Sequence, residues 1–411
     1  MPAANTFKAQ TRASERSAQY ERERGLRTVA AWLAEAAGAR RSGPFTRTKA
    51  PDDAITAAAA PGSRAAPVLA MVRHLAAVDA SGPKVGAPPV LLVHGATAWR
   101  GTFFEPHGGI ARHLLRHFDV WTLDWRGSKA ITDPWANVLR AAAPPGLVNA
   151  TLDDVIDGEL PAAVRLVRRK TGQAPRILGH CIGAAVSAAA IARGTLSHDD
   201  IDRHIVLATI GLFFQGGVDT WLRAQERLDT KISDKCWNLS FHSEPSWDPD
   251  YESVFSTWQR TPYPHCQIPF CRRISALFGA PYRPNEIGYI HDDEAVLSGQ
   301  FGMIPLTMLN HCARNVRRGW FGAAGAHESD RSDLNAERFR KLSLTLITGS
   351  ENQLWHRDSI DRMHTWLRRA KVERVQKRVF ARYGHQDLWW SPRSSAADGI
   401  YDYVTTALSP P

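Results

Sequence analysis

One cysteine of the chain lies in a context that favours nucleophilic chemistry. The segment Gly179-His-Cys181-Ile-Gly183 has the pattern Gly-x-nucleophile-x-Gly, with cysteine at the position that serine often occupies. In this pattern the nucleophile stands on a strained turn between a strand and a helix, where glycines avoid collisions with neighbouring backbone. An apolar strand precedes the turn and an alanine-rich helix follows it. The pattern therefore predicts attack by a thiolate on an acyl carbonyl.

Such a nucleophile needs a general base, and His385 is the candidate. It follows the last predicted strand in Tyr383-Gly384-His385, where Gly384 lets the loop bend toward the turn. Since the chain has 16 histidines, an ordinary loop histidine is the alternative. The order nucleophile, acid, histidine along the chain is the order expected for the Gly-x-nucleophile-x-Gly fold, and it favours the catalytic interpretation.

The carboxylate that would orient His385 is less well defined. After the strand at 342–348, the usual aspartate position is occupied by Asn352. Glu351 is the first candidate, Asp358 the second and Asp219 the third. A cysteine–histidine pair depends less on this third member than a serine–histidine pair does, because a thiol is more acidic than a hydroxyl.

Two backbone amides are expected to stabilise the oxyanion of the reaction. One is the amide of Ile182, which follows the nucleophile, and the other is the amide of Ala96, just after His94 and Gly95. His94 itself is expected to shape this loop. The helix that starts after Cys181 places its positive end beneath the sulfur, which favours the thiolate.

The remaining cysteines predict no metal centre. His265-Cys266 and Cys271 have no matching second pair at zinc-ligand spacing. Cys236 and Cys312 resemble ordinary buried thiols. Neither a metal nor an organic cofactor is therefore expected.

The elements that must position these residues alternate between strands and helices. A helix is predicted over 151–170, with Thr151 able to cap it. Most strands are almost continuously apolar, which is typical of a parallel sheet covered by helices on both faces. The predicted strands are 67–74, 89–97, 118–123, 176–180, 204–214, 342–348 and 375–380.

The chain divides into four parts. Residues 1–64 form a leader, with a helix over about 14–38 and a Pro- and Ala-rich linker over 40–64; the leader either docks on the core or mediates association. Residues 65–214 and 341–411 form the two parts of an α/β core. Residues 215–340 are too long for a loop and form their own substructure. Its many Trp and Phe residues are either its own core or the lining of a lid over an apolar substrate.

The composition limits the classes of protein to which the chain can belong. The 411 residues are 44% hydrophobic and 22% charged, with a net charge of +10, which is typical of a globular protein with a basic surface. Basic clusters interleaved with aromatic residues are lacking, so nucleic-acid binding is not expected. Neither an apolar run of about 18 residues nor an apolar signal core is present, and five cysteines suit free thiols in a reducing compartment. These features predict a cytoplasmic location.

Several short motifs in order resemble the α/β-hydrolase superfamily, and more closely the hydrolase-like region fused to some cholesterol-oxidase-like flavoproteins of the glucose–methanol–choline group. The flavin fingerprint is absent. The Gly-x-Cys-x-Gly element is also similar to polyhydroxyalkanoate synthases, although these have Asp where Asn352 stands. The motifs are Val93-His-Gly, Asp119-Val-Trp, Trp125-Arg, Thr151-Leu-Asp-Asp, Pro161-Ala-Ala-Val, Thr171-Gly, Gly179-His-Cys-Ile-Gly, Cys271-Arg-Arg-Ile-Ser, Phe278-Gly, Gln300-Phe-Gly, Gly349-Ser-Glu-Asn and Tyr383-Gly-His.

The resemblance implies an α/β-hydrolase fold, with a mostly parallel central sheet, helices on both faces and a helical lid insertion. It implies hydrolysis of an apolar ester or thioester by an esterase-, lipase- or thioesterase-like enzyme. Two alternatives stay open at this point: an acyltransferase of the polyhydroxyalkanoate synthase kind, and a non-catalytic binding partner of a flavoprotein oxidoreductase.

Overall fold

The structure is a computed structural model of the chain. The helix predicted over residues 14–38 lies outside the residues that it describes. The described residues are 52–55, 70–74, 86–105, 109–133, 140–141, 143–226, 236–241, 263, 266–327 and 329–409.

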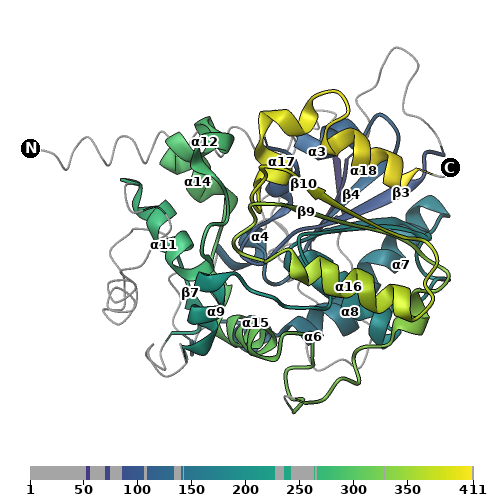
Figure 1. Cartoon of the computed structure of the whole chain (residues 1–411), viewed down its shortest axis with the longest axis horizontal. Helices are drawn as coiled ribbons and strands as arrows, with labels where there is room; N and C mark the ends of the chain where they lie inside the picture. The colour runs from purple at the N-terminus through teal and green to yellow at the C-terminus, as the bar shows by residue number, and fades with distance from the viewer. Residues whose placement is uncertain are drawn as a thin grey trace, which may run out of the picture.

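An eight-stranded sheet forms the centre of the molecule (Figure 1). Its strand order is β1-β2-β4-β3-β5-β6-β9-β10. The six strands from β4 to β10 in this order are parallel, while β1 and β2 join the β4 edge antiparallel. The predicted mostly parallel sheet is thus confirmed. The strands are β1 (Asp52–Ile55), β2 (Ala70–His74), β3 (Pro89–Val93), β4 (Asp119–Asp124), β5 (Arg176–His180), β6 (His204–Ala208), β9 (Ser343–Gly349) and β10 (Val375–Phe380).

The sheet begins earlier in the chain than the sequence suggested. Strand β1 lies at 52–55, where a linker was expected, and pairs antiparallel with β2. Its residues Asp-Asp-Ala-Ile lack the continuous apolar run that marks a central strand. By contrast β3, β5 and β6 are buried along their whole length, because helices cover both faces of the sheet there.

Helices cover the two faces of the sheet. On one face lie α7 (Leu160–Thr171), α8 (Ile182–Arg193) and α16 (Asp358–Arg369), and on the other lie α3 (Gly109–Leu114) and α18 (Ile400–Leu408) (Figure 1). The helix predicted over 151–170 is present as α6 (Leu152–Asp154), the π-helical turn η3 (Val155–Glu159) and α7. Thr151 and Asp154 form a capping box at its start. The shorter helices of the core are η1 (Arg100–Phe103), α4 (Lys129–Thr132), α5 (Pro145–Val148), α17 (Asp387–Trp390) and η6 (Pro392–Ser395).

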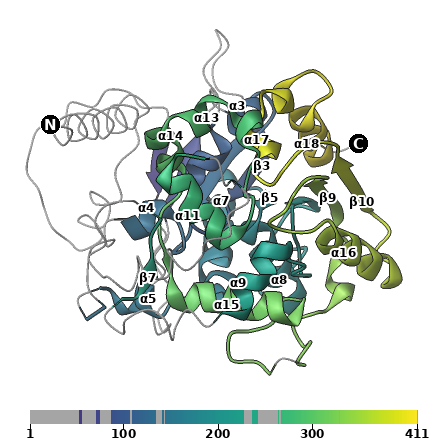
Figure 2. The same cartoon turned by 60° about the vertical axis from the view of Figure 1, so that its left-hand side comes forward.

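The segment between β6 and β9, which we call the insert, is mainly helical. Figure 2 shows α9, α11 and α15 of the insert beside one another, and α9 contacts both of the other two. A small antiparallel pair, β7 with β8, also belongs to it. Its elements are α9 (Val218–Gln225), β7 (Asn238–Leu239), α11 (Pro269–Phe278), α12 (Pro284–Ile287), α13 (Tyr289–Asp292), α14 (Glu294–Gln300), β8 (Ile304–Pro305), α15 (Leu306–Arg318) and η5 (Ala336–Phe339).

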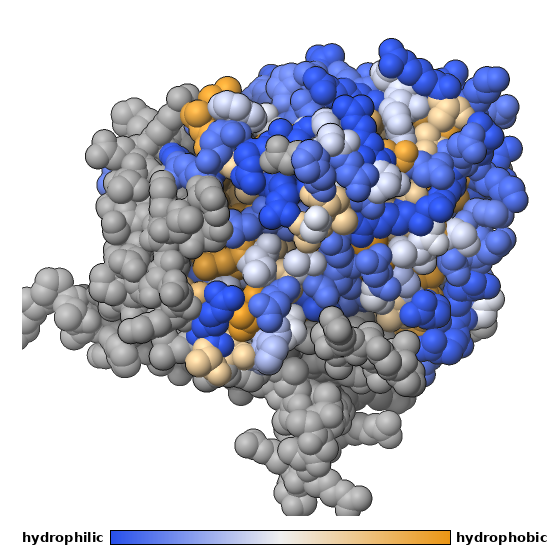
Figure 3. Space-filling view, turned by 90° about the horizontal axis from the view of Figure 1, so that it is seen from below, coloured by the Kyte–Doolittle hydropathy of each residue, from blue (hydrophilic) through white to orange (hydrophobic). Residues whose placement is uncertain are grey.

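On the face seen in Figure 3, the described residues are mostly hydrophilic, with apolar patches among them. Its large exposed apolar side chains are Val218, Trp221 and Leu222, all on α9. Among the described residues, none of the helices has the length and apolar character needed to cross a bilayer.

The turn between β5 and α8 supplies a test of the fold. A Cβ on Gly183 would collide with the carbonyl oxygen of Val93 in the neighbouring strand. We therefore expect Gly183→Ala to lower the free energy of unfolding by about 1–3 kcal/mol, the usual cost of overpacking, in a chemical denaturation series.

Gly158 gives the matched control, because it lies in a helical turn with no atom near the position of a Cβ. Gly158→Ala should leave stability unchanged or raise it by about 0.5–1 kcal/mol. Equal stability of the two variants would contradict the close approach of Gly183 to β3.

Candidate active site

Cys181 stands on a strained turn between β5 and α8. Its φ of 56° and ψ of −129° lie in a region that residues other than glycine rarely adopt. A Cβ on Gly179 would lie 2.6 Å from the Cα of Ala184, and a Cβ on Gly95 would lie 2.8 Å from the Cβ of Cys181. Gly179 is therefore required by close backbone approach, as the sequence pattern predicted, and Gly95 leaves room for the side chain of Cys181.

The thiol of Cys181 is buried but has three donors around it. The indole Nε1 of Trp355 donates to Sγ at 3.4 Å. The backbone amides of Ile182 and Ala96 also act on the sulfur and favour its anion. Burial nevertheless outweighs these donors and raises the pKa of Cys181 to about 11, so the thiol is protonated at neutral pH.

A buried polar network holds the loop that carries Ala96. Asp124 at the end of β4 accepts hydrogen bonds from the backbone amide and guanidinium of Arg100, and from the hydroxyl of Ser128. His94 contacts the carbonyl of Gly95 through Nδ1 at 2.7 Å, and its Nε2 lies 3.5 Å from Asp124. Burial lowers the pKa of His94, which is therefore neutral and serves to shape the loop.

His385 lies just before α17, in the loop that follows β10. Its side chain is buried, and the centroid of its ring lies 4.7 Å from the ring centroid of His180, the residue before Cys181. Burial, with a further contribution from His180, lowers the pKa of His385 well below its usual value. The ring is thus a neutral imidazole.

Asp387 fixes the loop of His385 to the insert. Its carboxylate accepts hydrogen bonds from the backbone amides of Gly384 at 2.8 Å and Arg283 at 2.9 Å. Burial raises the pKa of Asp387 to about 6. This aspartate was not among the expected site residues, since its partners are backbone groups that no local sequence pattern reveals.

The structure brings none of the three expected carboxylates into a hydrogen bond with His385 Nδ1, which is buried without a partner. Glu351 instead pairs with Arg283 of the insert, with 3.0 Å between Oε2 and Nε. Asp358 begins α16 and lies 3.3 Å from His356, and Asp219 lies in α9 beside Gly279. In this structure Glu351 therefore links the insert to the core and makes no hydrogen bond to His385 Nδ1.

Asn352, at the usual acid position, has a different role. Its Oδ1 accepts the backbone amide of Trp355 at 3.1 Å, and its Nδ2 donates to Thr348 Oγ1 at 3.2 Å. These bonds hold the loop from which Trp355 reaches Cys181. Sequence reasoning missed Trp355, because its contact with Cys181 joins residues 174 positions apart in the chain.

Cys181 and His385 line one cavity, which has about 830 Å³ of empty space and is partly open to solvent. The described hydrogen bonds include none between the two residues. From the core, Ala96, Ile182 and Trp355 also contribute to the wall. The insert supplies the larger share of the lining, namely Thr220, Arg223, Ala224, Glu226, Leu277, Phe278, Pro281, Phe301, Ile304, Leu309, Asn310, Cys312, Ala313 and Val316.

This arrangement joins a thiol, a neutral imidazole and two amide donors around an apolar space. Such a set can attack a carbonyl carbon and stabilise the resulting oxyanion. The insert would determine which substituents fit beside that carbon.

Comparison with known proteins places the fold of the chain in a family. The solved structures that resemble the chain include a lipase in an open form, at 13% identity over 83% of this chain and 94% of that one, with a TM-score of 0.50. Esterase E22 matches at 10% identity over 87% and 99%, with a TM-score of 0.50. The monoacylglycerol lipase of Paleococcus ferrophilus matches at 14% identity over 78% and 96%, with a TM-score of 0.48.

At these identities the structural likeness shows the fold alone. A search of curated proteins found no match. The sequence family described as alpha/beta hydrolase fold matches residues 88–392, which span both parts of the core and the insert between them. The chain therefore belongs to the α/β hydrolase fold family.

Proposed function

We propose that the protein hydrolyses an ester or thioester of an apolar acyl or alcohol group, with Cys181 as nucleophile and His385 as general base. The observation that carries this proposal is that both side chains line one apolar cavity together with Ala96 and Ile182. The strained turn at Cys181 adds support, because strain of this kind is concentrated at functional sites.

In the proposed mechanism the resting pair is a neutral thiol and a neutral imidazole. His385 accepts the proton of Cys181 as Sγ bonds to the carbonyl carbon, and the amides of Ile182 and Ala96 hold the oxyanion. The tetrahedral intermediate collapses, the leaving alcohol or thiol takes the proton from His385, and an acyl-cysteine is left. Water then attacks the acyl-cysteine with His385 as base, which releases the acid and restores the thiol.

Trp355 has a place in this mechanism as a donor to sulfur. Its indole N–H points at Sγ from 3.4 Å, and a hydrogen bond to an anion is about twice as strong as one to a neutral group. Trp355 therefore favours the thiolate over the thiol, against the effect of burial.

The cavity lining supports an apolar substrate and a lid role for the insert. Leu277 and Phe278 of α11 and Leu309 and Val316 of α15 contribute apolar surface beside Cys181. The charged pair Arg223 and Glu226, joined at 2.6 Å, stands in the same wall and would face the polar part of a bound molecule.

Acyl transfer is the second candidate function. The burial of Cys181, with 8% of its surface exposed, favours acyl transfer. An acyl-cysteine that is shielded from water survives until another acceptor arrives. Incubation with 3-hydroxyacyl-CoA separates the two: polymer supports a synthase-like enzyme, and free acid supports a hydrolase. The oxidoreductase partner and the cytoplasmic location remain predictions from sequence.

The pKa of the nucleophile gives a first test. Because burial raises the pKa of Cys181 to about 11, the reactive thiolate increases with pH across the neutral range. Alkylation of Cys181 by iodoacetamide, followed by peptide mass spectrometry, should therefore accelerate about tenfold per unit between pH 7 and pH 10. A plateau below pH 9 would show a thiolate that is already formed.

Substitution of the sulfur's donor gives a second test. Trp355→Phe keeps an aromatic ring but removes the N–H, so the thiolate should become less stable. Loss of a hydrogen bond to a charged group costs about 1.5–3 kcal/mol, and alkylation at a fixed pH should slow by about ten- to a hundredfold. Trp366→Phe is the matched control, because Trp366 lies on α16 against Phe213 and Phe339. Equal rates for the two variants would remove Trp355 from the mechanism.

Turnover of a panel of acyl esters and thioesters tests the pair directly. Cys181→Ala should abolish turnover, and His385→Asn should lower it by about 10²–10⁴-fold, the usual contribution of a general base. Cys236→Ala, at a buried cysteine outside the cavity, should retain it.

Glu351→Gln decides whether a carboxylate is needed. Since Glu351 pairs with Arg283, this variant should keep most of the activity. Loss of activity equal to that of His385→Asn would instead make Glu351 the orienting acid. Turnover by Cys181→Ala equal to that of the native protein would end the proposal of a cysteine nucleophile.

A further inference from the structure

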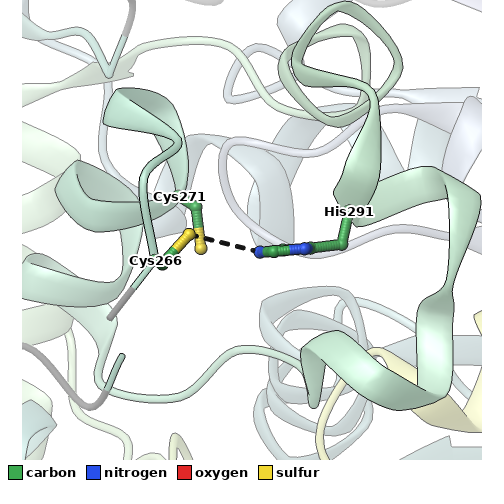
Figure 4. A group of neighbouring side chains, drawn as sticks. All are labelled: Cys266, Cys271 and His291. Atoms are coloured by element: carbon green, nitrogen blue, oxygen red, sulfur yellow. Dashed lines mark hydrogen bonds between the residues drawn. The ribbon is translucent and has the colours of Figure 1, made fainter. Parts of the chain in front are cut away.

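We propose that the insert contains a zinc site formed by Cys266, Cys271 and His291. Figure 4 shows the two sulfur atoms and the imidazole of His291 converging on one point. Cys266 precedes α11, Cys271 lies in the first turn of α11, and His291 belongs to α13. The sequence predicted no metal here, because the third ligand comes from a separate helix 20 residues further along the chain.

The spacing of the three donor atoms suits a single ion. All three lie within 4.8 Å of one another, and Sγ of Cys266 is 3.4 Å from Nε2 of His291. Zinc binds sulfur at about 2.3 Å and nitrogen at about 2.0–2.1 Å, so a tetrahedral site separates a sulfur and a nitrogen ligand by about 3.6 Å. The two sulfur ligands of such a site lie about 3.8 Å apart, which is within the 4.8 Å that separates the three donor atoms at most. The side chains therefore need little movement to bind an ion.

The chemistry of the ligands selects the metal. Thiolates and imidazole are the usual ligands of zinc, whereas calcium and magnesium prefer oxygen. The other ring nitrogen of His291, Nδ1, lies 3.3 Å from the carboxylate of Asp292. A carboxylate in this position fixes the ring and increases the basicity of the ligand nitrogen, as is common around zinc.

A buried polar group beside the cluster points to the same conclusion. The hydroxyl of Tyr282 is fully buried next to the thiol of Cys271 and makes no hydrogen bond of good geometry. A thiol is only a weak hydrogen-bond partner for a buried hydroxyl, and a poorly satisfied buried hydroxyl is costly. A metal ion in the cluster would give it a partner, either directly or through a water molecule in the fourth coordination position.

The ion would fix one wall of the cavity from a distance. It would join the start of α11 to α13, and the other end of α11 carries Leu277 and Phe278 into the cavity that holds Cys181. The ion takes no part in the proposed acyl chemistry, so the zinc site and the proposed function can fail independently of each other.

Metal binding to the full chain tests the proposal. Protein purified under reducing conditions and stripped with a chelator should bind one equivalent of Zn²⁺ in competition with a chromophoric chelator. Co²⁺ in place of zinc should give the thiolate-to-metal charge-transfer absorption and the intense visible bands of a tetrahedral site.

Variants locate the ion. Cys266→Ser, Cys271→Ser and His291→Asn should each weaken zinc binding at least about tenfold. Cys271 is buried, so the half-buried Cys266 and His291 keep the test valid if Cys271→Ser does not fold. Cys236→Ser and the exposed His327→Asn are matched controls that should bind as the native chain does.

Cys181→Ala should also bind zinc normally, which separates this site from capture of zinc by the nucleophile. Absence of stoichiometric zinc, equal binding by all variants, or a disulfide between Cys266 and Cys271 in protein kept free of oxygen would overturn the proposal.

Discussion

The close approach of three backbone segments around Cys181 is the constraint on which the rest of the structure depends. Strand β3, strand β5 and helix α8 meet there so tightly that Gly95, Gly179 and Gly183 cannot carry a side chain without collision. The same packing keeps Cys181 at a positive φ and brings the amides of Ala96 and Ile182 to the sulfur. Without this contact, Cys181 would have the surroundings of an ordinary buried core cysteine.

The sequence was most informative where structure is set by local pattern. Continuous apolar runs identified the central strands, and Gly-x-Cys-x-Gly identified the turn. Strand β1 was missed because an edge strand needs no apolar run. The strand predicted over 204–214 ends at Ala208, although Ile210, Leu212 and Phe214 beyond it are buried, because apolar pattern alone reports burial and not strand geometry.

The contacts of the site that could not be predicted join residues that are far apart in the sequence. Whether Glu351 faces His385 or Arg283 depends on α12, which lies about 70 residues earlier in the chain. His291 becomes a neighbour of Cys266 only because α13 lies beside the segment that precedes α11. The core motifs therefore indicate which side chains can do chemistry, whereas the insert determines what surrounds them. The contacts between the insert and these side chains cannot be predicted from sequence spacing.

The protonated state of the buried Cys181 thiol affects how readily the protein is oxidised in a cell. Peroxides react with thiolates, and sulfenic acid forms fastest on cysteines that are both ionised and accessible. Cys181, with a pKa of about 11 and 8% of its surface exposed, is neither at rest. A protonated and shielded sulfur of this kind reacts slowly with peroxides.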